Sequence, residues 1–160
     1  AREYGVTRED QDLFAYHSQK KASAAIEAGR FQEEICPVEL LRKGSGIGVF
    51  EQEEHPRKSV NLEALAELPT PFADQGTVTA GNASGVNDGA AALLVASEAA
   101  VSQWGLIPAA RIIAMQTVGV APRVMGIGPL PASQRLLAST GLSIDQLSVI
   151  ELNEALHTHN

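Results

Sequence analysis

The charged residues of this 160-residue chain are distributed very unevenly, and this constrains its fold more than any other feature. Residues 1–70 hold 9 of the 12 Lys and Arg and 13 of the 19 Asp and Glu, and no lysine follows Lys58. The last 90 residues therefore carry only about 10% charge, whereas a self-sufficient domain commonly carries about 25%. So little charge is typical of polypeptide that packs against more protein, although a surface of Ser, Thr, Asn and Gln is the alternative. We expect a chain that is part of something larger, either a piece of a longer protein or an obligate subunit.

The composition as a whole excludes several kinds of partner and location. The net charge of -7 disfavours binding to duplex nucleic acid. No apolar run approaches the ~18 residues needed to span a bilayer, and the first residues contain no hydrophobic signal region. The single cysteine, Cys36, cannot form an internal disulfide, which fits a reducing compartment. We therefore expect a soluble, cytoplasmic protein that binds neither nucleic acid nor membranes.

Local capping signals predict four helices. Thr7 and Asp10 have the spacing of a capping box, and apolar residues then recur at helical spacing, so we expect a helix over about 8–28. Asn61 is a suitable N-cap for a short helix over about 61–68, which the prolines that follow would end. The other two predicted helices cover about 98–104 and 131–139, and each is followed by a glycine stop signal.

Apolar runs predict strands between these helices. Residues 34–40 fit an edge strand, where proline is tolerated, and the glycine-rich residues 44–48 indicate a hairpin turn. Three further runs, 90–96, 110–118 and 147–152, are typical of strands buried on both faces, although 90–96 would also fit the start of a helix. Strands that alternate with helices indicate an α/β layered fold.

A loop over residues 81–89 has the composition of a ligand-binding segment. Gly81, Gly85 and Gly89 let the backbone approach a ligand closely, and the Asn, Ser and Asp between them can donate and accept hydrogen bonds. No Gly-Lys-Ser/Thr follows, so it is not a phosphate-binding P-loop. Ser84 is followed directly by Gly85, whereas a nucleophile elbow needs one residue between them. A structural turn leading into a buried strand is the alternative interpretation.

Several ordered motifs resemble those of the thiolases, the acyl-CoA acyltransferases. Residues 76–91 (GTVTAGNASGVNDGAA) resemble the family signature. Residues 4–12 resemble the start of the loop-domain helix, and His55-Pro56-Arg57 with residues 62–65 resembles the coenzyme-contacting region. Further along, residues 124–129 and 151–155 resemble two active-site motifs.

The resemblance implies a thiolase-like layered α-β-α-β-α core with an inserted loop domain. Residues 1–86 would form part of the coenzyme A-binding loop domain. Residues 87–107 would form the end of the N-terminal core domain, and 108–160 the start of the C-terminal core domain.

The resemblance also assigns coenzyme-binding residues. Ser84 would form a hydrogen bond with the pantetheine arm of coenzyme A, with a backbone contact from Ala80 beside it. Arg57 would lie near the adenine and phosphate end, where a fixed cation complements phosphate, and Phe72 would pack close to the adenine. For Arg57 the alternative is an ordinary solvated arginine. Coenzyme A and its acyl thioesters would be substrates, with no tightly bound cofactor.

By the same resemblance, two residues belong to the reaction site. Met125 would line the substrate cavity, unless it is ordinary core filling, and Asn153 would hold the water of an oxyanion hole for the thioester carbonyl. The nucleophilic cysteine and the catalytic histidine of the family are not in this chain. Cys36 stands where the family usually has an aliphatic residue, which indicates a small buried hydrophobic side chain. His55 lacks the glycines that flank the family's histidine.

The end of the chain, residues 156–160, departs from the family pattern. Glu154, His157 and His159 have a spacing that could ligate a metal. The sequence shows no residues placed to form hydrogen bonds with these ligands and orient them, so we expect no metal site.

The resemblance implies an internal fragment of a thiolase, whose full-length form would be a homodimer or homotetramer. The parent enzyme would catalyse reversible thiolytic cleavage of 3-oxoacyl-CoA, and this chain alone would be inactive. Residues 119–125 are similar to the 3-oxoadipyl-CoA branch of the family. Two alternatives remain: a non-catalytic protein that binds acyl-CoA or pairs with a full-length thiolase, and a hydrolase that uses Ser84, which the spacing around that serine disfavours.

Overall fold

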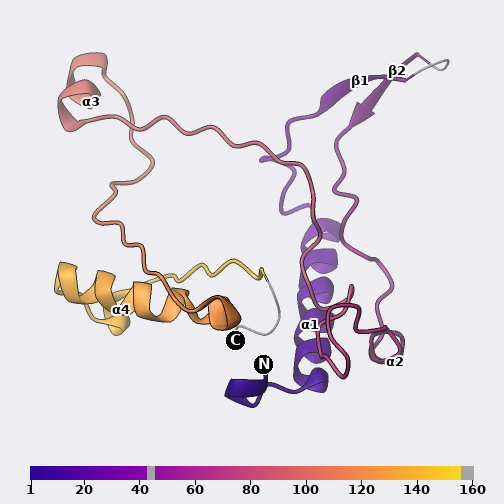
Figure 1. Ribbon diagram of the computed structural model, residues 1–160. Coiled ribbons are helices and arrows are strands. Elements are labelled where there is room, and N and C mark those ends of the chain that lie inside the picture. Colours follow the sequence, from indigo (N-terminus) through magenta and orange to yellow (C-terminus); the bar gives the residue numbers. More distant parts are fainter. Residues whose placement is uncertain (43–45, 156–160) are drawn as a thin grey trace. The chain divides into compact units, whose positions relative to one another are not determined.

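A computed structural model describes residues 1–42 and 46–155, the side chains of residues 41, 42 and 46 excepted. The chain divides into two compact units (Figure 1). Unit 1 is Ala1–Gly85 together with the residues from Glu154 onward, and unit 2 is Val86–Asn153. Each unit is described by itself below.

Unit 1 begins with a short 3-10 helix, η1 (Arg2–Tyr4), followed by the 20-residue helix α1 (Arg8–Glu27). The predicted capping box is confirmed: the Thr7 hydroxyl accepts from the Asp10 amide, and the Asp10 carboxylate accepts from the Thr7 amide. Gly29 has a φ of +65°, which is the left-handed conformation that ends helices. The predicted helix over 8–28 is therefore confirmed.

The face that α1 buries is largely polar. Its buried residues are Gln11, Asp12 and Ala15, whereas the apolar Leu13 and Ile26 are 44% and 43% exposed. A helix normally buries an apolar stripe, so buried polar side chains need hydrogen-bond partners. Gln11 Nε2 donates to the Thr7 carbonyl at 2.8 Å, one turn earlier, whereas Asp12 has its partners in the network described with the candidate site.

The predicted hairpin is confirmed, with shifted boundaries. Strand β1 (Val38–Arg42) pairs antiparallel with β2 (Gly46–Phe50), in a register that runs from Val38 opposite Phe50 to Arg42 opposite Gly46. The glycines predicted to lie in the turn belong in part to β2, and residues 43–45 lie outside the described residues.

The interpretation of Cys36 as a buried hydrophobic side chain is wrong, because its thiol is exposed. It lies between α1 and β1, where every residue from Phe31 to Leu40 is exposed. Its surroundings therefore cannot bury even a small side chain.

Helix α2 (Leu62–Ala66) follows, and it packs against α1. The Asn61 carbonyl oxygen Oδ1 accepts from the Ala64 amide at 2.7 Å, so the predicted N-cap is confirmed. The helix is shorter than predicted. Five residues are too few for a helix to be stable by itself in water, so α2 depends on contacts with the rest of unit 1.

Unit 2 contains four helical segments. Helix α3 (Glu98–Trp104) ends at Gly105, as predicted, with φ +60°. The 3-10 segment η2 (Pro122–Ile127) precedes α4 (Pro129–Thr140), which ends at Gly141, as predicted, with φ +70°. Helix α4 begins earlier than predicted because proline is favoured in the first turn of a helix. The short η3 (Ile144–Gln146) follows.

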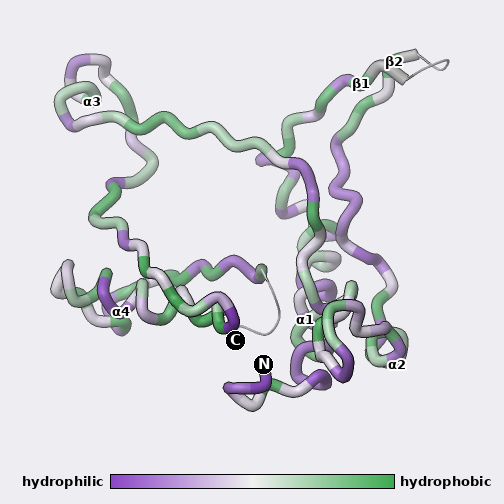
Figure 2. The backbone as a smooth tube through the Cα atoms, viewed as in Figure 1, coloured by the Kyte–Doolittle hydropathy of each residue, from purple (hydrophilic) through white to green (hydrophobic). Residues whose placement is uncertain are grey.

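The three strands predicted in unit 2 are wrong for this chain. Residues 90–96, 110–118 and 147–152 run without strand pairing, and residues 90–96 and 147–152 are exposed throughout. Figure 2 shows much of the chain around α3 as hydrophobic, and Leu93 and Ile107 are 87% and 97% exposed. A strand needs a neighbour for its N–H and C=O groups, and the described residues of unit 2 provide none for these runs.

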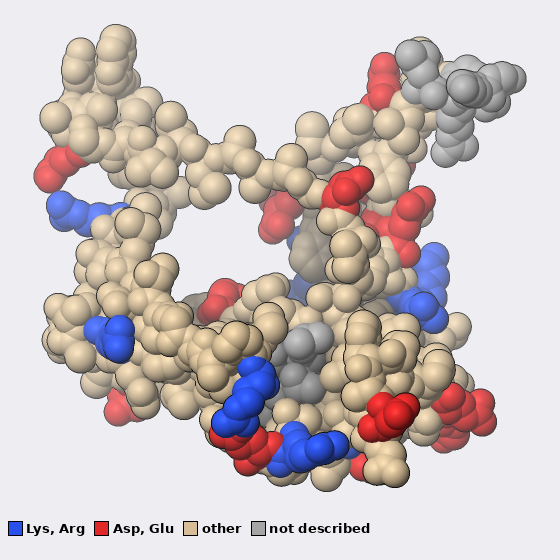
Figure 3. All heavy atoms as spheres, in the orientation of Figure 1, with Lys and Arg blue, Asp and Glu red and all other residues tan. Residues whose placement is uncertain are grey.

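Charge remains sparse in unit 2. Figure 3 shows few Lys, Arg, Asp and Glu side chains over α3 and α4 and the chain between them. The face of unit 2 in this view is therefore largely apolar or neutral. Among the described residues, no helix combines the length and the apolar character needed to cross a membrane.

Candidate functional site: a cavity in unit 1

A cavity of about 600 Å³ opens in unit 1. This volume lies within the roughly 300–1,000 Å³ that is usual for small-molecule sites. One wall comes from α2 and the loop before it, another from α1, and a third from residues 80–84. The lining residues are Ser18, Gln19, Glu54, His55, Arg57, Ser59, Val60, Asn61, Ala64, Leu65, Leu68, Ala80, Gly81, Ala83, Ser84 and Glu154.

Three of the residues singled out in the sequence lie together in this cavity: Arg57, Ala80 and Ser84. The Arg57 amide donates to Gln19 Oε1 at 2.9 Å, which ties the Arg57 loop to α1. The Ser84 amide donates to the Ala155 carbonyl at 3.3 Å, while the residue itself remains exposed. The two segments that carry Arg57 and Ser84 are thus each held in place by a backbone donor.

The other three predicted residues lie elsewhere in the described part of the chain. Phe72 belongs to unit 1 but is not among the residues that line the cavity, and it is 76% exposed. Met125, in η2, and Asn153 belong to unit 2, where both are exposed. Their roles remain predictions.

The cavity carries charges of both signs. Its lining contains the guanidinium of Arg57 and the carboxylates of Glu54 and Glu154. The Ser18 hydroxyl donates to Glu154 Oε2 at 2.5 Å, so that carboxylate already has a strong donor. Within residues 1–42 and 46–155, no carboxylate forms an ion pair with Arg57. Arg57 is therefore the cation with which an anionic ligand in this cavity would pair.

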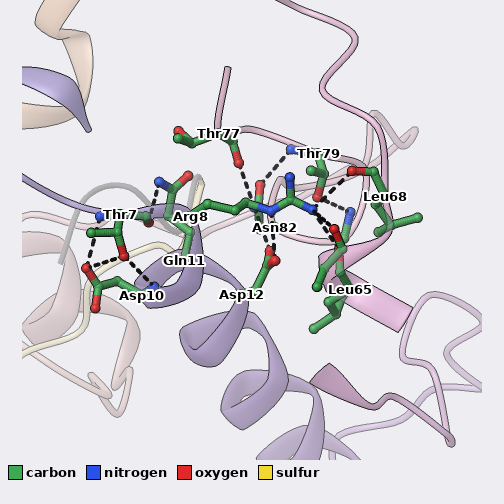
Figure 4. A network of polar contacts seen from close by, with 12 residues as sticks. Thr7, Arg8, Asp10, Gln11, Asp12, Leu65, Leu68, Thr77, Thr79 and Asn82 are labelled. Carbon is green, nitrogen blue, oxygen red and sulfur yellow. Dashed lines mark hydrogen bonds and ion pairs between the residues drawn. The ribbon is translucent and has the colours of Figure 1, made fainter. Parts of the chain in front are cut away.

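A buried polar network lies behind the cavity wall (Figure 4). Arg8 Nε donates to Asp12 Oδ2 at 2.7 Å, while Arg8 Nη2 donates to the carbonyls of Leu65 and Leu68 at 2.7 and 3.1 Å. Arg8 Nη2 also lies 3.3 Å from the Ala66 carbonyl. These are carbonyls at and just beyond the end of α2, where a helix leaves its last C=O groups unpaired.

Asn82 continues the network to the next segment. Its Nδ2 donates to Asp12 Oδ1 at 2.9 Å and to the Thr77 carbonyl at 3.0 Å, while its Oδ1 accepts from the Thr79 amide at 2.8 Å. Asn82 and Thr79 are completely buried, and Asp12 is 4% exposed. The network therefore joins α1, α2 and the loop that carries Ala80 and Ser84.

Sequence reasoning did not assign a role to Asp12 or Asn82. Both lie in motifs that carried the family resemblance, at residues 4–12 and 76–91. For Asn82, a polar residue within a run of small residues was the available signal, whereas Asp12 stands among other charged and polar residues. Asp12 and Asn82 are, however, seventy positions apart in the sequence, so their pairing is not a local signal.

Gly81 lies directly against α2. A Cβ at this position would be 2.5 Å from Leu65 Cδ2 and 2.6 Å from Leu68 Cδ1, closer than real Cβ contacts. Two cavity walls therefore meet with no room for a methyl group between them.

Hydrogen bonds in the first turn of α1 lower the pKa of Asp10. The Thr7 amide and the Thr7 hydroxyl both donate to Asp10 Oδ2 at 2.9 Å. The backbone hydrogen bond, followed by the side-chain one, holds the pKa of Asp10 below its usual value of 3.8.

The described residues contain no cluster of His, Cys, Asp and Glu that could hold a metal ion. Of the three residues weighed as metal ligands, Glu154 lies in the cavity wall, whereas His157 and His159 lie outside the described residues.

Two family models match the chain. Residues 1–99 match the thiolase N-terminal domain, and residues 106–159 match the thiolase C-terminal domain. The chain is 56% identical over 155 residues to a beta-ketoadipyl-CoA thiolase of Pseudomonas aeruginosa, covering 97% of this chain and 38% of that protein. It is 52% identical over 150 residues to the 3-oxoadipyl-CoA/3-oxo-5,6-dehydrosuberyl-CoA thiolase of Escherichia coli, covering 94% of this chain and 37% of that protein.

The chain is also similar to solved structures of thiolases. The acetyl-CoA acetyltransferase of Bacillus anthracis is similar with a TM-score of 0.90 and 41% identity, over 99% of this chain and 40% of that one. Human mitochondrial 3-ketoacyl-CoA thiolase is similar with a TM-score of 0.90 and 42% identity, with the same coverage. The chain spans about two fifths of the length of the relatives it matches. Because a family model covers more than half of it, the chain belongs to the thiolase family.

Proposed function

We propose that this chain supplies the coenzyme A-binding part of a thiolase, an acyltransferase that cleaves 3-oxoacyl-CoA to acetyl-CoA and a shortened acyl-CoA, reversibly. One observation carries the proposal: Arg57, Ala80 and Ser84 line a single cavity of a size suited to a small molecule. The family match supports the acyl-CoA class of substrate.

The cavity offers complementary groups for the two ends of coenzyme A. Arg57 is a permanent cation without a carboxylate partner among the described residues, so it can pair with phosphate oxygens. The Ser84 hydroxyl and the Ala80 backbone can form hydrogen bonds with the amides of the pantetheine arm. Phe72 is exposed and would pack against the adenine ring.

The reaction itself needs further groups. A cysteine thiolate attacks the 3-oxo carbonyl, acetyl-CoA leaves as its enolate takes a proton, and coenzyme A then accepts the acyl group from the cysteine. Asn153 would hold the water that stabilises the oxyanion, worth on the order of 3 kcal/mol per donor, and Met125 would line the acyl pocket. This chain contains neither the cysteine motif nor the histidine motif, so we expect no turnover from it alone.

The substrate branch, the assembly and the domains are part of the same proposal. Two of the relatives named above act on dicarboxylic 3-oxoacyl thioesters, which favours the 3-oxoadipyl-CoA branch. An acetyl-CoA acetyltransferase of Pseudomonas aeruginosa is nearly as similar, at 51% identity.

We further propose a cytoplasmic homodimer or homotetramer. Its loop domain would include residues 1–86, and its core domains residues 87–107 and 108–160, where strands form once neighbours are present.

The proposal is tested by titrating coenzyme A into the ¹⁵N-labelled chain and following amide chemical shifts. We expect weak binding, with a Kd on the order of 1 mM, because part of the pocket is supplied by other polypeptide. The shifts should concentrate at Arg57, Ala80 and Ser84. Ser84→Ala should weaken binding, whereas Ser102→Ala, at an exposed position of α3, serves as the matched control.

Two results would change the conclusion. Shifts that are absent up to about 10 mM coenzyme A, or confined to unit 2, would contradict the proposal. Submicromolar binding that Ser84→Ala abolishes would instead support the alternative of a self-contained acyl-CoA-binding protein.

A further inference from the structure

The most deeply buried part of unit 1 is unusual because it is a network of polar side chains around Arg8. Among the described residues, the fully buried side chains of greatest volume are Gln11, Asn82 and Thr79, all of them polar. Buried polar groups gain little net stability, and apolar groups of the same shape often do as well. Hydrogen bonds differ from apolar contacts in being directional, so they define position more narrowly. The network is therefore better explained by the geometry that it imposes than by stability.

Arg8 controls the wall that α2 provides. Its Nη2 donates to the carbonyls of Leu65 and Leu68, and the side chains of these residues line the cavity. Because α2 has only five residues, it cannot hold that position by itself. The guanidinium also binds Asp12 through Nε, so one planar group fixes α2 relative to α1.

Asn82 controls the opposite wall. Its three hydrogen bonds use both amide protons and the carbonyl, and they hold residues 77–82 against Asp12. The cavity-lining Ala80, Gly81, Ala83 and Ser84 lie on either side of Asn82 in sequence. Displacing Asn82 would therefore displace the segment that carries Ser84.

The two walls also touch each other at Gly81, where no methyl group would fit against Leu65 and Leu68. Two things thus set the spacing of the walls: the contact at Gly81, and the hydrogen bonds of Arg8, Asp12 and Asn82 behind the lining residues. Movement at either end of the network would change the width of the cavity.

We propose that Arg8, Asp12 and Asn82 are positioning residues that set the width of the cavity between α2 and residues 80–84, and so its affinity for coenzyme A. None of the three lines the cavity, so they act through Leu65, Leu68 and Ser84. The affinity part of this inference rests on the proposed function, whereas the positional part does not.

Arg8→Lys is the sharpest variant. Lysine keeps the positive charge beside Asp12, but a single ammonium group cannot occupy the sites of both Nε and Nη2, so the contacts with the α2 carbonyls are lost. Arg111→Lys is the matched control, because Arg111 also pairs with a carboxylate, that of Glu98, at an exposed site in unit 2. If Arg8→Lys does not fold, Asn82→Ala replaces it, because it removes the hydrogen bonds of Asn82 without burying a charge. Asn87→Ala, at an exposed position, is its control.

Two readouts separate positioning from general stability, and they are taken on variants whose α1 amide shifts match the wild type. The first is the set of nuclear Overhauser contacts between the Gly81 α-protons and the Leu65 and Leu68 methyl groups in the ligand-free chain. The second is the Kd for coenzyme A. We expect Arg8→Lys to weaken the contacts and to raise the Kd at least about fivefold, and Arg111→Lys to change neither.

The outcomes distinguish this inference from the proposed function. Unchanged Gly81 contacts in Arg8→Lys would overturn the inference, whatever the affinity. Lost contacts with an unchanged Kd would overturn its link to affinity. If the wild-type chain does not bind coenzyme A but the contacts are lost in the variant, the proposed function fails while the positional role stands.

Discussion

The side-chain amide of Asn82 donates a hydrogen bond of 2.9 Å to the carboxylate of Asp12, a residue seventy positions earlier in the chain. Both side chains are buried. The bond joins α1 to the segment that carries Ala80 and Ser84. It is the central link of a network in which Arg8 of α1 binds the Leu65 carbonyl of α2 and Asn82 binds the Thr77 carbonyl.

Asn82→Asp is expected to destabilise unit 1 strongly. The new carboxylate has the shape of the amide but no donors, so it would face the Asp12 carboxylate and the Thr77 carbonyl with acceptors only. A buried charge without a partner costs roughly 3–5 kcal/mol. Urea unfolding followed by far-UV circular dichroism, to which α1 contributes as the longest helix described, measures the loss.

The loss of stability in Asn82→Asp should be smaller at pH 5 than at pH 7. The two facing carboxylates repel each other, so one of them takes up a proton more readily in the folded state. Asn87→Asp, at an exposed position in unit 2, is the control. Equal stability of Asn82→Asp and wild type at pH 7 would mean that the network is not formed.

Gly81→Ala should separate the two cavity walls. The added Cβ would come within 2.5 and 2.6 Å of the Leu65 and Leu68 methyl carbons, and Leu65 is only 7% exposed, so it has little room to move. We expect a loss of about 1–3 kcal/mol, the usual cost of overpacking. Gly89→Ala is the control, because no heavy atom lies within 4 Å of a Cβ built there. Hydrogen exchange of the Leu65 and Asn82 amides measures the local effect, and similar exchange in both variants would argue against a close contact.

Arg57→Ala should weaken coenzyme A binding about tenfold, equivalent to about 1.4 kcal/mol, because Arg57 is the arginine that lines the cavity within the described part of the chain. The difference from wild type should shrink as NaCl is raised, since Arg57 is exposed and its attraction to phosphate is screened. Arg135→Ala, at an exposed position of α4, is the control. An affinity that is independent of both Arg57 and salt would remove Arg57 from the site. The amide-shift titration in the presence and absence of salt provides the measurement.

The start of α1 should loosen in acid. The lowered pKa of Asp10 means that its carboxylate contributes stability above pH 3.8, and that this contribution is lost as the pH falls through the lower pKa of the folded state. The Thr7 amide proton, which donates to Asp10, should report the same titration in its chemical shift, with a midpoint below 3.8. The titration should disappear in Asp10→Asn. A midpoint at or above 3.8 would show that the capping box does not persist in solution.

Much of the local structure follows from short stretches of sequence. The capping box at Thr7 and Asp10, the N-cap at Asn61 and the glycines that end α3 and α4 all act within one helical turn, so their partners are known as soon as the sequence is read. The motif residues Arg57, Ala80 and Ser84 were also singled out by sequence, but only the tertiary structure shows that they line one cavity, and their roles remain predictions.

The burial of Asn82 against Asp12 could not be predicted from the local sequence. A buried polar side chain is acceptable only where partners from other segments reach it, and here they come from α1 and from the Thr77 and Thr79 backbone. The apolar residues Leu13 and Ile26 of α1, in contrast, remain exposed.

The sequence by itself determined the family, the N-caps of α1 and α2 and the glycines that end α3 and α4, because each depends on a local motif. The coenzyme-binding roles of Arg57, Ala80 and Ser84 remain predictions. Only the tertiary structure decided whether the apolar runs 90–96, 110–118 and 147–152 become strands. A helix forms its backbone hydrogen bonds within itself, whereas a strand forms them only with a neighbouring strand. The described residues of unit 2 offer no such neighbour, so the same apolar runs remain extended and unpaired.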